Sequence, residues 1–357
     1  MKRKKILISI TSQFGYHIPT YMYCKYMDKE KFEVHYVGYD WGKERKIIED
    51  VEVHYIPMFS NRVKMYYNYI RTINKIIRKE KFNLLFLVVC KGYFFIRMSN
   101  LFRKSVMDVR TGDVYIEKKG FSLFNSKIRI ASLFFRNITI LSESLREELK
   151  LPKRKCRLVT LGAEQPDIPD KSFNQINLFY IGTIQKRNIH QTVEGVALFL
   201  RNNPDIHLTY NIVGYGFPET EKILVETIQS HNLSGIVKFH GRKYYPEILD
   251  IVKNSNIGVA YVPIIKGYDC QPTTKLFEYV LAGMPVIATK TTENSKEILP
   301  ECGVLVQDNP NSFAKGLEEI QMNLNTYNSR QIKEKYYAFR WDTILSDNLS
   351  PYLYNLC

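Results

Sequence analysis

Short apolar runs alternate with longer segments of mixed polarity along almost the whole chain. The apolar runs are nearly continuous and rich in β-branched and aromatic residues, as at residues 4–10 and 83–89. Such runs are typical of parallel strands that are buried on both faces of a sheet. Most of the segments between them have the spacing of amphipathic helices, so the pattern predicts doubly wound α/β architecture.

This alternation occurs twice. The first half predicts strands at residues 4–10, 32–38, 51–57, 83–89, 105–109 and 138–141. The second half predicts strands at residues 176–182, 207–214, 236–241, 257–263, 285–290 and 303–307. Helices are expected between these later strands at residues 188–200, 220–230, 246–253 and from residue 273 onward. Two independent βα sheets in tandem are therefore predicted.

The segment between the two halves has the composition of a linker. Residues 164–175 are rich in Pro and Asp, with Ser and Asn, and they separate two regions of regular alternation. A chain of 357 residues is long enough for two domains that each bury a core. The first domain is accordingly predicted to cover residues 1–165.

Composition points to a globular protein of the cytosol. The chain is 45% hydrophobic and 24% charged, and no apolar stretch approaches the roughly 20 residues that span a bilayer. The apolar run after the basic N-terminus is short and ends in polar residues, which favours a first strand over an export signal. Six cysteines are scattered without a CxxC pair, so reduced thiols and no structural zinc are expected.

The net charge of +15 is concentrated in one region. Residues 61–104 contain eleven basic side chains and a single acid, Glu80, interleaved with tyrosines and isoleucines at helical spacing. A basic helix of this kind can lie on an anionic membrane surface, bind nucleic acid, or be an ordinary helix with a solvated basic face. The rest of the chain favours the membrane over nucleic acid.

Two glycine-containing turns follow strands of the second half. Residues 182–188 read Gly-Thr-Ile-Gln-Lys-Arg-Asn, in which a tight turn, a helix N-terminus and two cations suit a diphosphate without a metal. A plain βα turn is the alternative. Residues 213–218 contain Gly214 and Gly216, but Glu219 occupies the third position of a dinucleotide fingerprint, which is therefore not met.

Residues 271–288 form the most specific motif of the chain. Pro272 and the two threonines that follow open a predicted helix, with Thr273 or Thr274 as a candidate N-cap, and Gly283 ends it. The N–H groups at the start of this helix can receive a phosphate. Glu278, one turn later, can accept hydrogen bonds from a ribose diol; pairing with Lys275 on the same helix is the less favoured alternative.

This stretch resembles the nucleotide-sugar site of family 4 glycosyltransferases, which are group 1-like enzymes, in the variant Pro-Thr-Lys-Leu-Phe-Glu-Tyr followed by Ala-Gly-x-Pro-Val-Ile-Ala. The similarity extends over most of the second half, with looser support from residues 140–144 and 161–163. Residues 339–342 look like the start of the helix that crosses back to the first domain. The resemblance implies a GT-B fold: two Rossmann-like domains facing each other across a cleft, at residues 1–165 and 166–338, and a returning helix at residues 339–357.

The resemblance also implies a retaining, metal-independent transferase. Glu278 would bind the ribose of the donor, and Lys186 and Arg187 would neutralise the departing diphosphate. The implied donor-binding residues are Gly182, Gly214, Thr273, Thr274, Lys275 and Glu278. The chain has no DxD sequence, which agrees with a metal-free site, and no other cofactor is expected.

Three departures from the family pattern affect the site. Cys270 occupies the position of the family's first paired glutamate, so the neighbouring Asp269 is predicted to act with Lys186 and Arg187 as a catalytic residue. The glycine-rich loop after the first strand is reduced to residues 13–15. Arg110 stands where many members carry a histidine. The acceptor-side candidates are His17, Asp108 and Arg110. A mutual ion pair of the last two, and a structural role for the histidine, remain alternatives.

The combined expectation is transfer of a hexose-type sugar from a UDP- or GDP-sugar to a glycan or lipid-linked glycan. The reaction would take place at the inner face of a cell membrane, in bacterial surface polysaccharide assembly, and no nucleic acid partner is expected. Two alternatives remain: a GT-B sugar-nucleotide epimerase, and a non-catalytic basic module that binds membrane or RNA. The broken fingerprint disfavours an NAD-dependent oxidoreductase.

Overall fold

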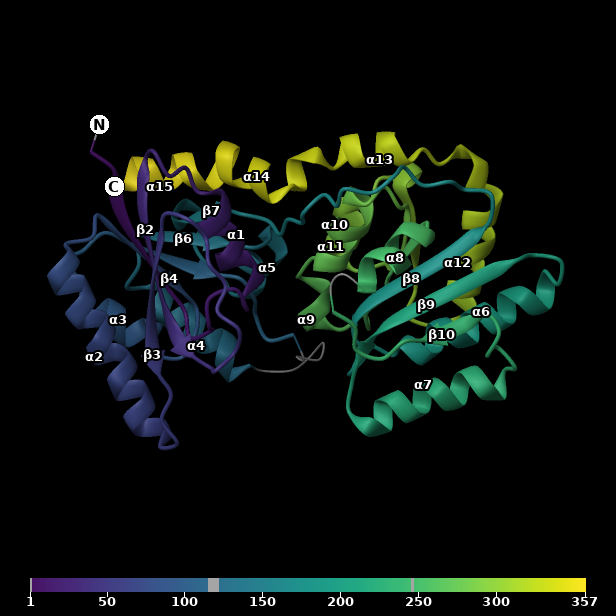
Figure 1. The fold of residues 1–357 in the computed structure, drawn as a ribbon, viewed down its shortest axis with the longest axis horizontal. Helices are drawn as coiled ribbons and strands as arrows, with labels where there is room; N and C mark the ends of the chain where they lie inside the picture. Colours follow the sequence, from purple (N-terminus) through teal and green to yellow (C-terminus); the bar gives the residue numbers. More distant parts are fainter. Residues whose placement is uncertain (1, 115–121, 245–246) are drawn as a thin grey trace. The chain divides into compact units, whose positions relative to one another are not determined.

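The computed structural model describes residues 2–114, 122–244 and 247–357, which form two compact units (Figure 1). The N-terminal unit contains the described residues up to Leu161 together with Trp341–Cys357, and the C-terminal unit contains those from Gly162 to Arg340. Each unit is built around one parallel sheet.

The N-terminal unit has a seven-stranded parallel sheet in the order β3-β2-β1-β4-β5-β6-β7. Its strands are β1 (Lys4–Ser9), β2 (Phe32–Asp40), β3 (Val51–Pro57), β4 (Leu84–Val88), β5 (Ser105–Val109), β6 (Asn137–Ile140) and β7 (Cys156–Leu158). Its helices are α1 (Ile18–Tyr26), α2 (Arg62–Glu80), α3 (Tyr93–Met98), α4 (Leu123–Ser132), α5 (Glu143–Glu148), α14 (Trp341–Ile344) and α15 (Ser350–Leu356), with a 3₁₀ turn at Lys153–Lys155 and a π-helical turn at Leu345–Leu349.

The C-terminal unit has a six-stranded parallel sheet in the order β10-β9-β8-β11-β12-β13. Its strands are β8 (Ile176–Thr183), β9 (Leu208–Tyr215), β10 (Val237–Phe239), β11 (Ile257–Ala260), β12 (Val286–Thr289) and β13 (Gly303–Val306). Its helices are α6 (Ile189–Asn202), α7 (Pro218–Ser230), α8 (Glu247–Asn254), α9 (Lys266–Asp269), α10 (Thr274–Leu281), α11 (Thr292–Glu297), α12 (Pro310–Met322) and α13 (Ser329–Lys335), with 3₁₀ turns at Pro300–Cys302, Leu324–Thr326 and Tyr337–Phe339.

Both sheets reverse their strand order at one point, between β1 and β4 in the first unit and between β8 and β11 in the second. Ligands of open parallel sheets bind outside the carboxyl ends of the strands at such a switch point. The predicted fold class, two doubly wound Rossmann-like units, is confirmed.

The C-terminal segment Trp341–Cys357 belongs to the N-terminal unit. Trp341, Leu345, Leu349 and Leu353 are buried in that unit's core. The indole of Trp341 lies 5.9 Å from the ring of Tyr23 in an edge-to-face contact. Burial of these side chains fixes the end of the chain to the first sheet.

The amphipathic pattern in the basic region corresponds to α2, a helix of 19 residues. Its N-cap Asn61 accepts a hydrogen bond from the backbone of Lys64, and it ends at Lys81 in a left-handed conformation. The predicted strand at residues 257–263 is shorter than expected, because the backbone N–H of Val262 donates to the hydroxyl of Thr289 instead of continuing the ladder.

Candidate active site

Two glycines meet at the end of β8, one of the two strands that flank the switch point of the C-terminal sheet. Gly182 and Gly214 are register partners on β8 and β9. A Cβ atom on Gly214 would lie 2.1 Å from the carbonyl oxygen of Gly182, so only glycine fits. Gly182 itself has φ +152°, and a Cβ there would lie 3.6 Å from Cε of Lys275. Three predicted donor-site residues therefore lie side by side.

The next residues form a tight turn that places the two predicted cations. The N–H of Arg187 donates to the carbonyl of Ile184, and Lys186 and Asn188 both have left-handed backbones, with φ 54° and 55°. Non-glycine residues rarely adopt this conformation and cluster at ligand sites when they do. The guanidinium of Arg187 stacks over the ring of Tyr268 at 4.2 Å from its centroid.

Helices α6 and α10 are among the helices of this unit that begin without a side-chain cap. The N-cap of α6 is Asn188 and the N-cap of α10 is Thr273, and neither side chain accepts a hydrogen bond from its helix. The hydroxyl of Thr273 is buried and lacks a hydrogen-bond partner among the described residues. Thr273 thus holds the predicted N-cap position and Thr274 opens the helix. The leading N–H groups of both helices stay available to an anion.

Lys275 and Glu278 form an ion pair at 2.8 Å, with side chains 32% and 38% exposed. The pairing that the sequence analysis disfavoured is therefore present. Both groups remain in contact with solvent, so a ligand can exchange with either partner at small cost. Glu278 also lines a hollow of about 240 Å³ with Ile181 and Leu249.

Asp269, the predicted substitute for the missing glutamate, is held by the start of α11. One carboxylate oxygen accepts from the backbone N–H of Thr292 at 2.8 Å, and the other accepts from its hydroxyl at 2.7 Å. In this arrangement Asp269 joins α9 to α11. The sequence offered no sign of this contact, because Thr292 lies beyond the next strand.

Three tyrosines that the sequence analysis did not single out build the walls around the turn. Tyr279 accepts the backbone N–H of Ile181 at 3.0 Å, and Tyr180 donates to the carbonyl of Thr183 at 2.6 Å. Burial raises the pKa of both phenols, so they stay neutral. Tyr268 carries the stacking contact with Arg187. Their positions in or beside the two motifs are the only signal that the sequence contains for them.

In the N-terminal unit, Asp108 and Arg110 lie at the carboxyl end of β5 and are both buried. Nε of Arg110 lies 3.0 Å from Asp108, and the other contact of that carboxylate oxygen is the hydroxyl of Thr139 at 2.6 Å. The pairing is poorly aligned, so no guanidinium nitrogen has a hydrogen-bond partner in the described part of the chain. Burial raises the pKa of Asp108, although the positive charge of the neighbouring Arg110 lowers it.

His17 is the N-cap of α1, where its ring Nδ1 faces the backbone N–H and hydroxyl of Thr20. Burial lowers the pKa of His17 to about 4, and the positive charge of Arg110 acts in the same direction. The three acceptor-side candidates are thus electrostatically connected. The structure also gives His17 the structural role that the sequence left open.

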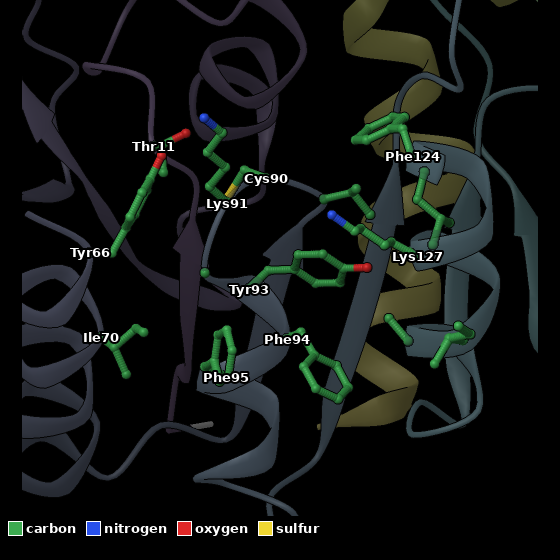
Figure 2. A pocket seen from close by; sticks show the side chains of 15 residues that line it. Thr11, Tyr66, Ile70, Cys90, Lys91, Tyr93, Phe94, Phe95, Phe124 and Lys127 are labelled. Atoms are coloured by element: carbon green, nitrogen blue, oxygen red, sulfur yellow. The ribbon is translucent and has the colours of Figure 1, made fainter. Parts of the chain in front are cut away.

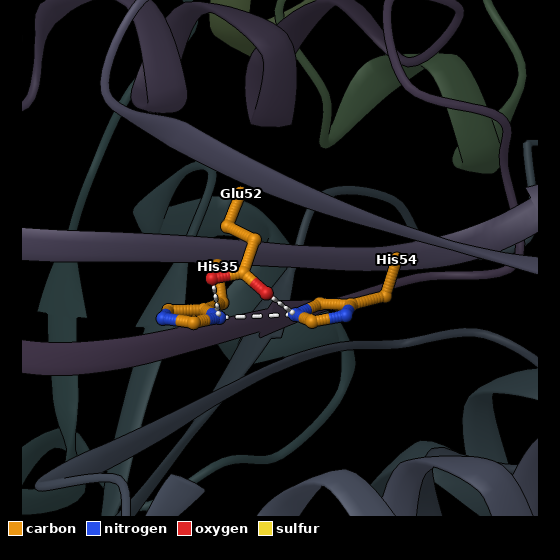
Figure 3. Close-up of side chains that lie close together, drawn as sticks. All are labelled: His35, Glu52 and His54. Carbon is orange, nitrogen blue, oxygen red and sulfur yellow. Dashed lines mark hydrogen bonds and ion pairs between the residues drawn. The ribbon is translucent and has the colours of Figure 1, made fainter.

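A histidine cluster lies away from these strand ends, in the middle of β2 and β3 (Figure 3). Nδ1 of His35 faces Nε2 of His54 at 3.0 Å, and Glu52 lies 3.4 Å from each. The rings are nearly parallel, 9° apart, and face each other as in an N–H···N hydrogen bond. A carboxylate oxygen of Glu33 lies 3.1 Å from Nε2, the other ring nitrogen of His35. A bridging metal ion would require the rings to turn.

Comparison with known proteins covers both units. Residues 175–323 match the family model described as "Glycosyl transferases group 1". No curated protein sequence matches the chain. Sucrose-phosphate synthase from Thermosynechococcus elongatus is 14% identical with a TM-score of 0.77, over 99% of this chain and 98% of that one.

Two further solved structures are similar over nearly their whole lengths. HepE of Anabaena in complex with UDP and glucose is 12% identical with a TM-score of 0.71, over 96% of this chain and 98% of that one. The lipopolysaccharide outer core galactosyltransferase WaaB is 10% identical with a TM-score of 0.70, over 96% and 97%. These matches show that the fold is GT-B.

The basic region of the N-terminal unit contains helices that are short or polar. Within the described residues, no helix combines the length and the apolarity that a membrane-spanning segment needs.

Proposed function

We propose that this chain is a retaining, metal-independent glycosyltransferase of family 4 that uses a UDP- or GDP-sugar. The observation that carries the proposal is that Gly182 lies beside Lys275 and is followed by the turn that contains Arg187. This turn follows β8, a strand that flanks the switch point of its sheet, and the residues of that sheet match the group 1 model. HepE, a protein of the same fold, has been solved with UDP and glucose.

The donor would bind at the carboxyl ends of β8 and β9. Glu278 would accept hydrogen bonds from the ribose diol, which replaces its contact with Lys275. Lys275 would then be free to move to a phosphate, together with Lys186, Arg187 and the uncapped N–H groups of α6 and α10. The support for this arrangement is that Lys275 lies beside Gly182, that Lys186 and Arg187 lie in the turn that follows, and that neither helix start is capped by its own side chain.

The reaction would exchange one C–O bond for another at the anomeric carbon. The bond to the diphosphate breaks, the acceptor oxygen bonds to the same face of the sugar, and the acceptor's proton leaves on the departing diphosphate. Lys186 and Arg187 would stabilise the negative charge that develops there, and such electrostatic stabilisation usually contributes most to the rate enhancement. Asp269 would leave Thr292 to hold a sugar hydroxyl in place of the missing glutamate.

On the acceptor side, the guanidinium of Arg110, with Asp108 and His17, would face the incoming hydroxyl group. The acceptor would be a glycan or lipid-linked glycan in bacterial surface polysaccharide assembly. Residues 61–104 would hold the protein on the inner, anionic face of the cell membrane from the cytoplasm. The support is the charge of α2, where exposed Arg71, Lys75 and Arg78 face solvent.

A ligand panel tests the donor site. Thermal unfolding is measured with UDP, GDP, TDP, ADP and NAD for the native chain, for Lys186→Met and for the control Lys222→Met, which removes an exposed lysine of α7. At about 100 times the dissociation constant, the bound nucleotide should add about 2.7 kcal/mol to the free energy of unfolding. We expect this with one nucleoside diphosphate, reduced in Lys186→Met and unchanged in the control.

Mass spectrometry then distinguishes the chemistry. A transferase releases the nucleoside diphosphate only when an acceptor is present, whereas an epimerase converts the donor sugar alone. Stabilisation by NAD, or by no nucleotide or nucleotide-sugar at all, would overturn the proposed function.

A further inference from the structure

A cavity in the described part of the N-terminal unit lies at the switch point of its sheet, and it has a volume of about 940 Å³ (Figure 2). Thr11 and Cys90 follow β1 and β4, the two strands between which the order reverses. Helix α2 supplies Ile70 on one side and α4 supplies Ile130 on the other. We call this space the α2–α4 cavity. Its volume is near the upper end of the roughly 300–1,000 Å³ of ligand pockets.

The walls of the α2–α4 cavity do not suit a bare sugar. Most of the residues that line it are hydrophobic, among them Phe94 and Phe95 of α3 and Phe124 of α4. A sugar ring carries a hydroxyl on almost every carbon, and burying these without partners is costly. An aliphatic chain has no such requirement and gains free energy from the same walls.

The few polar groups of the cavity suit an anion. Lys91 and Lys127 line it, and neither forms an ion pair with a carboxylate within the described residues. In Figure 2 the ammonium group of Lys127 lies beside the ring of Tyr93, between Lys91 above it and the rings of Phe94 and Phe95 below it. Tyr93 contributes a buried hydroxyl that lacks a hydrogen-bond partner among the described residues. The cavity is therefore amphipathic, because two cations and a phenol hydroxyl lie among mostly apolar side chains.

The surface around the cavity also carries both apolar side chains and cations. Phe95 is 60% exposed, and Leu123 and Ile130 of α4 are 68% and 58% exposed. Exposed apolar side chains that gather in one place mark binding sites. On the other side, Ile70 also lines a second hollow of about 460 Å³ with the cations Arg71 and Lys75. The apolar walls thus continue into the basic face of α2.

We propose that the α2–α4 cavity binds the lipid part of the acceptor: a long aliphatic or isoprenoid chain that ends in a phosphate. The chain lies between α2 and α4 against the phenylalanines, and Lys91, Lys127 and the hydroxyl of Tyr93 hold the phosphate. This inference rests on the proposed function, because it names the class of acceptor for that same transfer. It places the attached sugar at the carboxyl edge of the sheet, where Thr11 lies and where β5 ends in Arg110.

Isothermal titration calorimetry with farnesyl phosphate, below the concentration at which it forms micelles, tests the inference. Geranyl phosphate and isopentenyl phosphate vary the chain, and farnesol and inorganic phosphate each remove one half of the ligand. The variants are Phe95→Glu and Lys127→Met. The control is Phe102→Glu, which alters a fully exposed side chain outside the cavity. Circular dichroism and thermal unfolding show whether each variant is folded.

We expect farnesyl phosphate to bind the native chain and the Phe102→Glu control equally. Phe95→Glu and Lys127→Met should each weaken binding by about tenfold or more, the effect of removing one charged contact or one apolar wall. Affinity should fall as the chain is shortened, and farnesol and inorganic phosphate should both bind poorly. If Phe102→Glu loses as much affinity as Phe95→Glu, the ligand adsorbs to exposed apolar surface and the inference is wrong.

Equal binding of inorganic phosphate and farnesyl phosphate, or unchanged affinity in both cavity variants, would also overturn it. The nucleotide panel is run on the same samples, so that the two proposals can fail separately. A chain that is stabilised by a nucleotide but ignores lipid phosphates keeps its proposed function and loses this acceptor class. A chain that binds lipid phosphates but no nucleotide has a lipid site and no support as a transferase.

Discussion

Replacing Glu278 by Gln separates the observed ion pair of this carboxylate with Lys275 from the ribose contact that we propose for it. The change removes one charge and keeps the size of the side chain. The ion pair with Lys275 is 2.8 Å long, but both side chains are about one-third exposed. Solvent screens such a pair, and exposed helical pairs contribute about 0.3–0.5 kcal/mol. The unliganded protein should therefore unfold at nearly the same temperature, within about 2 °C.

The effect on nucleotide binding should be much larger. A hydrogen bond to a charged group contributes about 1.5–3 kcal/mol, which corresponds to roughly a 10- to 150-fold weaker affinity when the charge is lost. At a UDP concentration of about 100 times the native dissociation constant, the ligand stabilises the native chain by about 2.7 kcal/mol. That gain should fall to between about 0.3 and 1.4 kcal/mol in Glu278→Gln.

Thermal unfolding with and without the nucleotide that the panel selects measures both quantities in one series. Glu226→Gln is the matched control, because Glu226 pairs with Lys222 on the exposed face of α7, away from the motif. Equal stabilisation by nucleotide in Glu278→Gln and the native chain would refute the ribose contact. A loss of more than about 5 °C without ligand would show that the pair is not screened as its exposure implies.

Three further changes test the packing and the charges that surround the site. Between pH 4 and 6.5 the unfolded chain binds a proton at His17 that the folded chain does not, so the free energy of unfolding should rise with pH in this range. The variant His17→Asn keeps a capping oxygen, and its free energy of unfolding in urea should change by about 2 kcal/mol less between pH 4.5 and 7.5 than that of the native chain. An unchanged difference would contradict the lowered pKa of His17. Tyr279→Phe should cost about 1–3 kcal/mol in thermal unfolding because the N–H of Ile181 loses its acceptor, and a neutral result would mean that water replaces the hydroxyl. Gly214→Ala should destabilise by about 1–3 kcal/mol because its Cβ would overlap a carbonyl oxygen of β8, whereas Gly235→Ala, where nothing lies within 4 Å, should be neutral in the same assay.

The sheet architecture was predictable because its signal is local. A strand buried on both faces must be apolar along its whole length, and an amphipathic helix must repeat with its own period. The strands of both units accordingly lie where the apolar runs are, except β7, a three-residue edge strand with an arginine at its centre and mostly exposed side chains. The ends were less predictable, as at β11, where a side-chain acceptor on Thr289 replaces the ladder after Ala260.

The candidate site was only partly predictable. Its glycines, cations and helix start lie within short motifs, and the structure brings Gly182, Gly214 and Lys275 together. The partners of those residues come from other elements. Tyr268 reaches Arg187 from α9, and Thr292 holds Asp269 from α11. No spacing rule along the chain indicates such contacts, because they depend on how helices pack over the sheet.

The sequence by itself determined two parallel α/β sheets, a basic region before residue 104 and the motif at residues 271–288 of the second unit, because each depends on residues that are close along the chain. Only the tertiary structure decided which side chains are already paired, as in Lys275 with Glu278, and which are buried without hydrogen-bond partners among the described residues, as in Arg110. It alone decided that α2 and α4 enclose an amphipathic cavity at the strand ends. The physical reason is that burial and pairing are properties of surfaces that meet only after the chain has folded.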